Sequence, residues 1–153
     1  MKRLLRSVVD LPPVWMLVFL VVIWGQAKAW NPFGFQNQNA TLAGWVLIVL
    51  AVLLSGWAAL QFLKKRTSIV PRNTPSAFIA EGPYRISRNP IYLADALVVL
   101  GWALVMGSTI GLILVPVFMG VITKRFITAE EAGLKAAYPD SQTAFFRKTR
   151  RWL

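Results

Sequence analysis

The chain turns from polar to apolar within residues 82–92, whose sequence is GPYRISRNPIY. This stretch holds two tyrosines, two arginines and an Asn-Pro corner, namely Tyr84, Tyr92, Arg85, Arg88 and Asn89–Pro90. Proline suits the first position of a helix, where its missing N–H has no intrahelical partner. The stretch therefore predicts a helix that enters a membrane, with polar chemistry concentrated where the membrane begins.

The composition supports a membrane protein. Of the 153 residues, 56% are hydrophobic and only 15% are charged, which lies outside the usual soluble range. Four apolar runs are to be compared with the ~20 residues that cross a bilayer as a helix: Leu11–Ala29, Leu42–Leu63, Pro90–Met106 and Thr109–Thr123. We predict an all-α integral membrane protein with about four transmembrane helices, a cytoplasmic inter-helix loop and C-terminal amphipathic helices.

The last two runs are short, so we expect a tight hairpin at Gly107–Ser108, with Lys124 and Arg125 snorkelling beyond the fourth helix. We expect a single domain over residues 1–153, with two transmembrane helices in 1–63. The rest, 64–153, holds the motif-bearing loop, the helical hairpin and the C-terminal cytoplasmic helices. The first run also resembles a signal peptide ending at Ala27–Ala29, but we expect it to be retained as a helix.

Basic residues predict the orientation, because Lys and Arg are retained on the cytoplasmic side. They gather before the first run, in residues 64–90 and after the fourth run, whereas Asn31–Thr41 has no charge. Both termini and the long connection are therefore predicted to be cytoplasmic. The net charge of +11 lies beside apolar spans, which favours anionic lipid over nucleic acid as the partner.

Missing residue types limit the chemistry. The chain has no cysteine and no histidine, which excludes disulfides, a thiolate nucleophile, a histidine base and ordinary zinc sites. It also has no glycine-rich dinucleotide loop. Catalysis must use Asp, Glu, Tyr, Lys or Arg, and no metal site is expected.

Several short motifs, in this order and spacing, resemble one family of membrane enzymes. They are Gly82-Pro83-Tyr84-Arg85, Arg88-Asn89-Pro90-Ile91-Tyr92, Glu130–Glu131 and Arg150-Arg151-Trp152. The chain resembles the integral membrane methyltransferases that include isoprenylcysteine carboxyl methyltransferase and the phospholipid methyltransferases, over about residues 67–153. Asn89 departs from the carboxyl methyltransferases, which have His there, so the acceptor stays open.

The resemblance implies methyl transfer from S-adenosylmethionine to a lipid-borne acceptor, either a prenylcysteine-like carboxylate or a phospholipid amine. It implies cofactor-binding roles for eight residues, namely Tyr84, Arg85, Arg88, Asn89, Pro90, Tyr92, Glu130 and Glu131. These types suit the cofactor, whose carboxylate fits an arginine fork, whose ribose diol fits a carboxylate and whose adenine fits an aromatic ring.

Each residue also has a structural interpretation. The arginines are consistent with the cytoplasmic bias alone, and Tyr92 with an interfacial anchor. Asn89–Pro90 is consistent with a helix N-cap. Thr128 and Glu131 fit a capping box that would open a short helix, which would leave Glu130 for the ribose, but the two glutamates could also have the reverse roles. Beyond Ser141 we expect a helix lying on anionic lipid through a face that includes Phe145, Thr149 and Trp152.

Asp95 is the one carboxylate inside an apolar run, where a charge costs about 2.5–3.5 kcal/mol. It follows Tyr92 by three residues and Arg88 by seven, so a helix would place them on one face. Two explanations are open: a structural pair with Arg88, or a catalytic role. An amine acceptor must lose a proton, and without histidine Asp95 or Tyr92 is the nearest relay.

Two other functions compete with methyl transfer. One is a nicotinamide-dependent lipid or sterol reductase, against which the acidic pair argues because a 2′-phosphate needs clustered arginines. The other is a non-catalytic membrane adaptor that binds anionic lipid. The sequence leaves the oligomeric state open.

Overall fold

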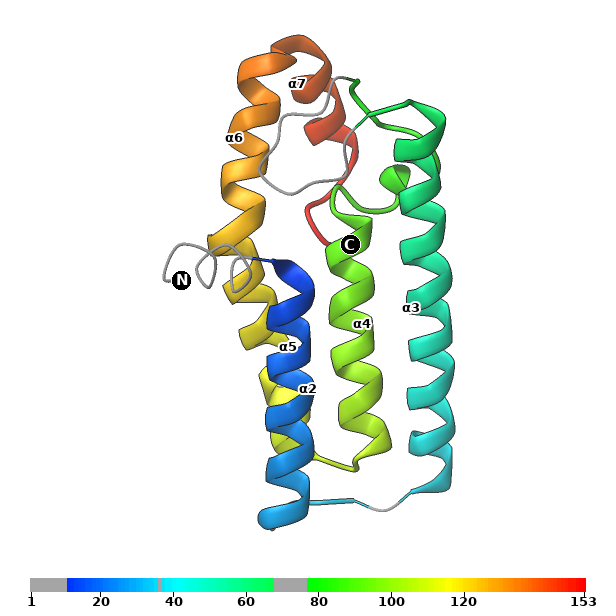
Figure 1. The fold of residues 1–153 in the computed structure, drawn as a ribbon, viewed down its shortest axis with the longest axis vertical. Helices are drawn as coiled ribbons and strands as arrows, with labels where there is room; N and C mark the ends of the chain where they lie inside the picture. Colours follow the sequence, from blue (N-terminus) through cyan, green and yellow to red (C-terminus); the bar gives the residue numbers. More distant parts are fainter. Residues whose placement is uncertain (1–10, 36, 68–76) are drawn as a thin grey trace, which may run out of the picture. The chain divides into compact units, whose positions relative to one another are not determined.

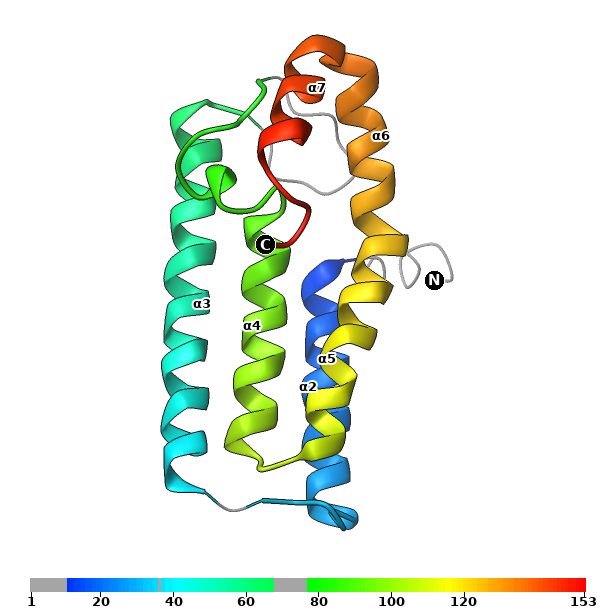
Figure 2. The same ribbon diagram turned by 180° about the vertical axis from the view of Figure 1, so that it is seen from behind.

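The computed structural model describes residues 11–35, 37–67 and 77–153. Its regular elements are all helices: α2 (Pro12–Ala29), α3 (Gln38–Lys64), the 3₁₀ turn η1 (Gly82–Arg85), α4 (Pro90–Val105), α5 (Thr109–Ile122), the π-helical turn η2 (Thr123–Ile127), α6 (Thr128–Ala137) and α7 (Pro139–Lys148). Figures 1 and 2 trace this order from the blue α2 to the red C-terminal segment. The predicted all-α class is confirmed for the described residues.

Three helices are long and apolar enough to cross a membrane: Pro12–Ala29, Gln38–Lys64 and the continuous helix Thr109–Ala137. The helix α4 is a shorter apolar helix of 16 residues. The predicted count of four spans is therefore supported for three of them. Residues 68–76 of the long connection lie outside the described residues, as do the basic N-terminal residues Lys2, Arg3 and Arg6.

The chain forms two compact units. Among the described residues, the first unit comprises 11–51 and 95–122, and the second unit comprises 52–94 and 123–153. Helices α3 and α4 each contribute a part to both. The single-domain assignment stays a prediction, and each unit is considered by itself.

Close helix packing characterises the first unit. A Cβ atom built on Gly44 would lie 2.5 Å from the Gly101 carbonyl oxygen, and one built on Gly101 would lie 2.6 Å from that of Gly44. Phe19 and Phe118 meet edge to face at 5.2 Å, joining α2 to α5. Because lipid removes most of the hydrophobic driving force between helices, small residues that allow such close approach hold apolar helices together.

The predicted hairpin at Gly107–Ser108 is confirmed. Gly107 has φ +56°, a conformation that glycine adopts without steric cost, so α4 ends and α5 begins within a few residues. The Gly107 carbonyl accepts the Phe35 N–H at 2.9 Å, and the Ser108 hydroxyl bonds Gln26 Oε1 at 2.5 Å. These bonds tie the hairpin to the end of α2 and to the α2–α3 connection.

The second unit has its own core, which includes Ala58, Ile79, Tyr84 and Phe145. Phe145 of α7 is 9% exposed and Thr149 is 6% exposed. The predicted α7 face therefore packs inside this unit, where it buries apolar area, instead of lying on lipid. The basic residues Arg147, Lys148 and Arg150 are exposed.

The predicted capping box at Thr128 is wrong. Residues 109–137 form one continuous helix, so the backbone N–H groups beyond Thr128 are not the orphan donors that a cap would satisfy. The Thr128 hydroxyl instead bonds the Thr123 carbonyl at 2.9 Å, across the π-helical turn. Single π turns inside helices often accompany functional sites.

Candidate functional site

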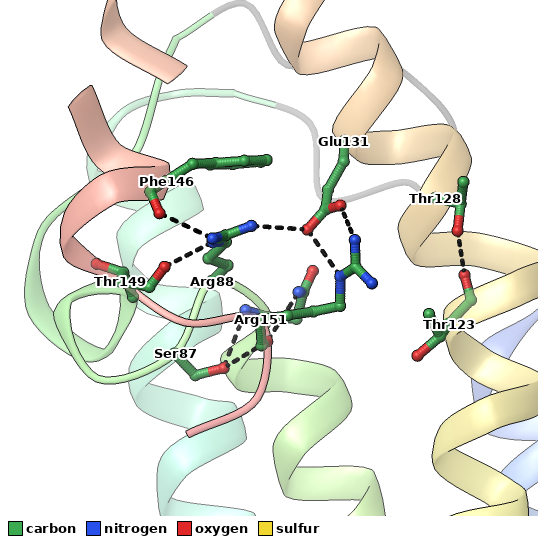
Figure 3. Close-up of polar contacts among 9 residues, drawn as sticks. Ser87, Arg88, Thr123, Thr128, Glu131, Phe146, Thr149 and Arg151 are labelled. Carbon is green, nitrogen blue, oxygen red and sulfur yellow. Dashed lines mark hydrogen bonds and ion pairs between the residues drawn. The ribbon is translucent and has the colours of Figure 1, made fainter. Parts of the chain in front are cut away.

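A cluster of charges in the second unit is centred on Glu131 of α6. Glu131 Oε1 accepts bonds from Arg88 Nη1 at 3.4 Å and Arg151 Nε at 3.1 Å, and Oε2 accepts one from Arg151 Nη2 at 2.5 Å. Figure 3 shows the carboxylate between the two guanidinium groups. The Glu131 and Arg88 side chains are 13% and 18% exposed, so this is a largely buried network rather than a solvated surface pair.

Arg88 is held on several sides. Its Nε donates to the Thr149 carbonyl at 2.6 Å and its Nη2 to the Phe146 carbonyl at 2.9 Å. The guanidinium carbon lies 3.8 Å from the centre of the Phe146 ring, which adds a cation–π contact. At least three of its five N–H groups are therefore engaged, and Glu131 is its carboxylate partner.

The C-terminal segment binds the backbone and side chains of the motif. The Arg88 N–H donates to the Arg150 carbonyl at 2.9 Å. The Arg151 carbonyl accepts both the Ser87 hydroxyl at 3.2 Å and Asn89 Nδ2 at 3.0 Å. Pro90 is the first residue of α4, as predicted, but the Asn89 side-chain amide is used for this contact with Arg151.

The second glutamate, Glu130, lies in a different setting. Its Oε1 accepts the Tyr92 hydroxyl at 2.6 Å, and the Tyr92 ring packs against Phe126 of the π-helical turn, 6.3 Å between centroids. Burial, with a smaller contribution from the charge of Glu130, raises the pKa of the Tyr84 hydroxyl above its usual value. One carboxylate and two tyrosines thus form a second group of polar side chains.

The structure brings together most of the residues that the sequence singled out. Arg88, Asn89, Tyr92 and the two glutamates belong to the second unit, whereas Arg85 is exposed and lies outside their network. Asp95 belongs to the first unit, and its Oδ2 is buried without a hydrogen-bond partner among the described residues.

Four network residues were missed as individual site residues, namely Ser87, Phe146, Thr149 and Arg151. Arg151 stood inside the Arg150-Arg151-Trp152 motif, which was the available signal. Thr149 and Phe146 contribute main-chain carbonyls, which a residue of any type can supply. The Phe146 ring and the Ser87 hydroxyl are too common in sequences to indicate a site by themselves.

An open cavity of about 860 Å³ occurs in the first unit. It is lined by residues near the α2–α3 connection and the hairpin, including Lys28, Asn31, Asn37 and Thr41. None of the residues of the Glu131 network lines it, so volume alone does not identify the site.

Comparison with known proteins identifies the family. The phospholipid methyltransferase family matches residues 39–141, which is about two thirds of the chain and includes α3 to α6. The chain belongs to the phospholipid methyltransferase family. The match includes Arg88, Tyr92 and both glutamates.

The matched family is one of methyltransferases, and three helices of this chain are long and apolar enough to cross a membrane. The protein is therefore an integral membrane protein of a methyltransferase family. A relative from Haemophilus influenzae, described as an uncharacterized protein, is 33% identical over 63 residues, which make up 41% of this chain and 100% of that relative. No solved structure matches the chain.

Proposed function

We propose that this protein transfers a methyl group from S-adenosylmethionine to a lipid-borne acceptor at the cytoplasmic membrane face. The acceptor is a phospholipid amine or a prenylcysteine-like carboxylate. The family match supports methyl transfer. The observation that supports a cofactor site in the second unit is that the two adjacent glutamates have different partners, Tyr92 for Glu130 and the arginines for Glu131. The residues there fit the cofactor chemically, since guanidinium, carboxylate and aromatic groups occur in one unit.

We assign the ribose diol to Glu130 rather than Glu131. Glu131 uses both oxygens for arginine bonds, and giving these up would leave two guanidinium groups unneutralised. Glu130 accepts the Tyr92 hydroxyl, which already shows that this carboxylate can bind a hydroxyl group of the kind that a ribose diol presents. Tyr84 and Tyr92 supply rings for the adenine or the sulfonium.

The two arginines of the motif, Arg85 and Arg88, also differ in their contacts. Arg88 is committed to Glu131 and two carbonyls, so its proposed role is to fix the Asn89–Pro90 corner and present its remaining N–H groups. Arg85 is exposed and is free of that network, which suits it to the cofactor carboxylate.

When bound, the cofactor supplies an electrophilic methyl group on a sulfonium. Displacement requires alignment, so the protein's part is to position both partners and exclude water. For an amine acceptor, the Asp95 carboxylate takes the proton that the nitrogen loses, or Tyr92 relays it by passing its own hydroxyl proton to Glu130 as it accepts the new one. A carboxylate acceptor needs no base.

The orientation can be measured directly, because the chain has no cysteine. We expect a cysteine at exposed Ser141 to react with a membrane-impermeant maleimide only after the cytoplasmic side is opened. A cysteine at exposed Asn37 should react from outside in intact cells. The reverse pattern would overturn the cytoplasmic placement of the C-terminus.

Binding calorimetry on detergent-solubilised protein tests the function. S-Adenosylmethionine and its demethylated product should bind and raise the melting temperature, since a ligand that binds only the folded state stabilises it. Glu130→Ala should lose affinity with little change in melting temperature, and Glu81→Gln, at an exposed position, is the matched control.

If the protein bound a reduced nicotinamide cofactor but neither S-adenosylmethionine nor its demethylated product, the reductase function would replace methyl transfer. No binding of either class would leave the lipid-binding adaptor. A loss of affinity in Glu131→Ala but none in Glu130→Ala would reverse the assignment of the two glutamates.

A further inference from the structure

The last residues of the chain contact the motif in two chemically different ways. Main-chain carbonyls of Thr149, Arg150 and Arg151 accept four bonds from Ser87, Arg88 and Asn89. The Arg151 side chain reaches back to Glu131 with two donors. Figure 3 shows Arg151 between Ser87 and Glu131, on the pale red C-terminal segment of the ribbon.

Of these three C-terminal residues, Arg151 makes both kinds of contact. Its carbonyl orients Ser87 and Asn89, and its guanidinium binds the carboxylate that also binds Arg88. Residues 87–89 and residue 131 are 42 or more positions apart in the sequence, and Arg151 joins them through one residue. A planar guanidinium suits this task because it gives two parallel bonds to a carboxylate.

We propose that Arg151 is a positioning residue of the methyl-donor site: it holds Glu131 and the Ser87–Asn89 corner in place, and so fixes the part of α6 that carries Glu130, to which the cofactor is assigned above. The inference rests on the function proposed above and adds a residue to it. Arg151 does not touch the cofactor. It acts through Glu131, Ser87 and Asn89.

The charge balance explains why the position needs arginine. A guanidinium stays charged in proteins, and the hydrogen bonds with Glu131 raise the pKa of Arg151 further. Without it, Arg88 alone faces Glu131, at the longer distance of 3.4 Å. Glu131 would then turn toward other donors and disturb Glu130, the residue before it in α6.

The test compares Arg151→Ala, Arg151→Lys and Arg150→Ala in the full chain. Calorimetry with S-adenosylhomocysteine gives the affinity of folded protein, and methyl transfer into a lipid extract gives KM for each substrate. Arg150 is the control because it is exposed and supplies the network with its main-chain carbonyl, which the substitution keeps. Each variant is measured well below its own melting temperature.

We expect Arg151→Ala to lose about tenfold in affinity, the size of a coupling within one network. The KM for the methyl donor should rise, whereas the KM for the lipid should be unchanged. Arg151→Lys should recover part of the loss, since an ammonium cannot reproduce the fork. In a Glu131→Gln background, Arg151→Ala should cause little further loss.

Two results overturn the inference separately. If the parent binds and Arg151→Ala binds as tightly, while only its melting temperature falls, Arg151 is structural and the proposed function stands. If the parent itself does not bind the methyl donor or its product, the proposed function fails, and the positioning role fails with it.

Discussion

The two units hold their helices together by different interactions. The first unit relies on close backbone approach at Gly44 and Gly101 and on edge-to-face rings. The second unit relies on a charge network around Glu131 that reaches the C-terminal segment. Apolar membrane helices gain most from close packing, whereas a helix end beyond the apolar run can accommodate charges and neutralise them.

Each unit also contains a carboxylate of a different kind. Glu131 has two arginine partners, while Asp95 Oδ2 is buried without a hydrogen-bond partner among the described residues. A buried polar atom without a partner is costly, so it persists where function or a bound group compensates for it. We therefore expect substitution of Glu131 to lower stability more than substitution of Asp95, and substitution of Asp95 to lower methyl transfer.

The largest expected change in stability comes from Glu131→Gln. The substitution keeps the shape but leaves Arg88 and Arg151 without their shared charge. We expect the free energy of unfolding to fall by about 2–3 kcal/mol, less than for a fully buried pair, because the Arg151 side chain is 42% exposed. Thermal unfolding in detergent measures the change, and an unchanged melting temperature would show that the network contributes no stability.

A smaller loss is expected from Gly101→Ala in the first unit. The new Cβ would lie 2.6 Å from the Gly44 carbonyl oxygen, and backbone there has to shift, at a cost of about 1–3 kcal/mol. Gly25→Ala is the matched control, since a Cβ there meets nothing within 4 Å and alanine favours the helix. Equal melting temperatures for the two variants would contradict the role of close approach.

Asp95→Asn should change stability least among the buried sites. Removing a charge from an apolar run relieves a cost, so we expect the free energy of unfolding to stay within about 1 kcal/mol or to rise, with donor affinity unchanged. Methyl transfer should fall at least tenfold if Asp95 orients or deprotonates the acceptor. Normal transfer by the folded variant would remove Asp95 from the proposed chemistry.

The sequence predicted the parts that depend on local pattern. Apolar run length gave the helices, and Gly107 gave the hairpin. The prediction of a capping box at Thr128 failed because the same residue types occur at the start of a helix and inside one. Only the preceding helix, which here continues through Thr128 without a break, decides between the two. Which of the two glutamates binds Arg88 and Arg151 could not be predicted, since both arginines are distant from residues 130–131 in sequence and only the folded chain brings them to Glu131.

The smallest expected effect is at the exposed pair between Lys65 and Glu81, 2.9 Å apart, whose side chains are 38% and 58% exposed. The hydrogen bond and charge of Lys65 lower the pKa of Glu81 from its ordinary value of 4.5. A lowered folded pKa adds stability that is present above the ordinary pKa and lost as the pH falls through the folded value. Because exposed pairs contribute little, Glu81→Gln should barely change the melting temperature at neutral pH, and the difference from the parent should vanish in acid. If Glu81→Gln lowered the melting temperature as much as Glu131→Gln, solvent exposure would not explain how much an ion pair stabilises this protein. The contrast between a buried network and a solvated pair would then no longer hold.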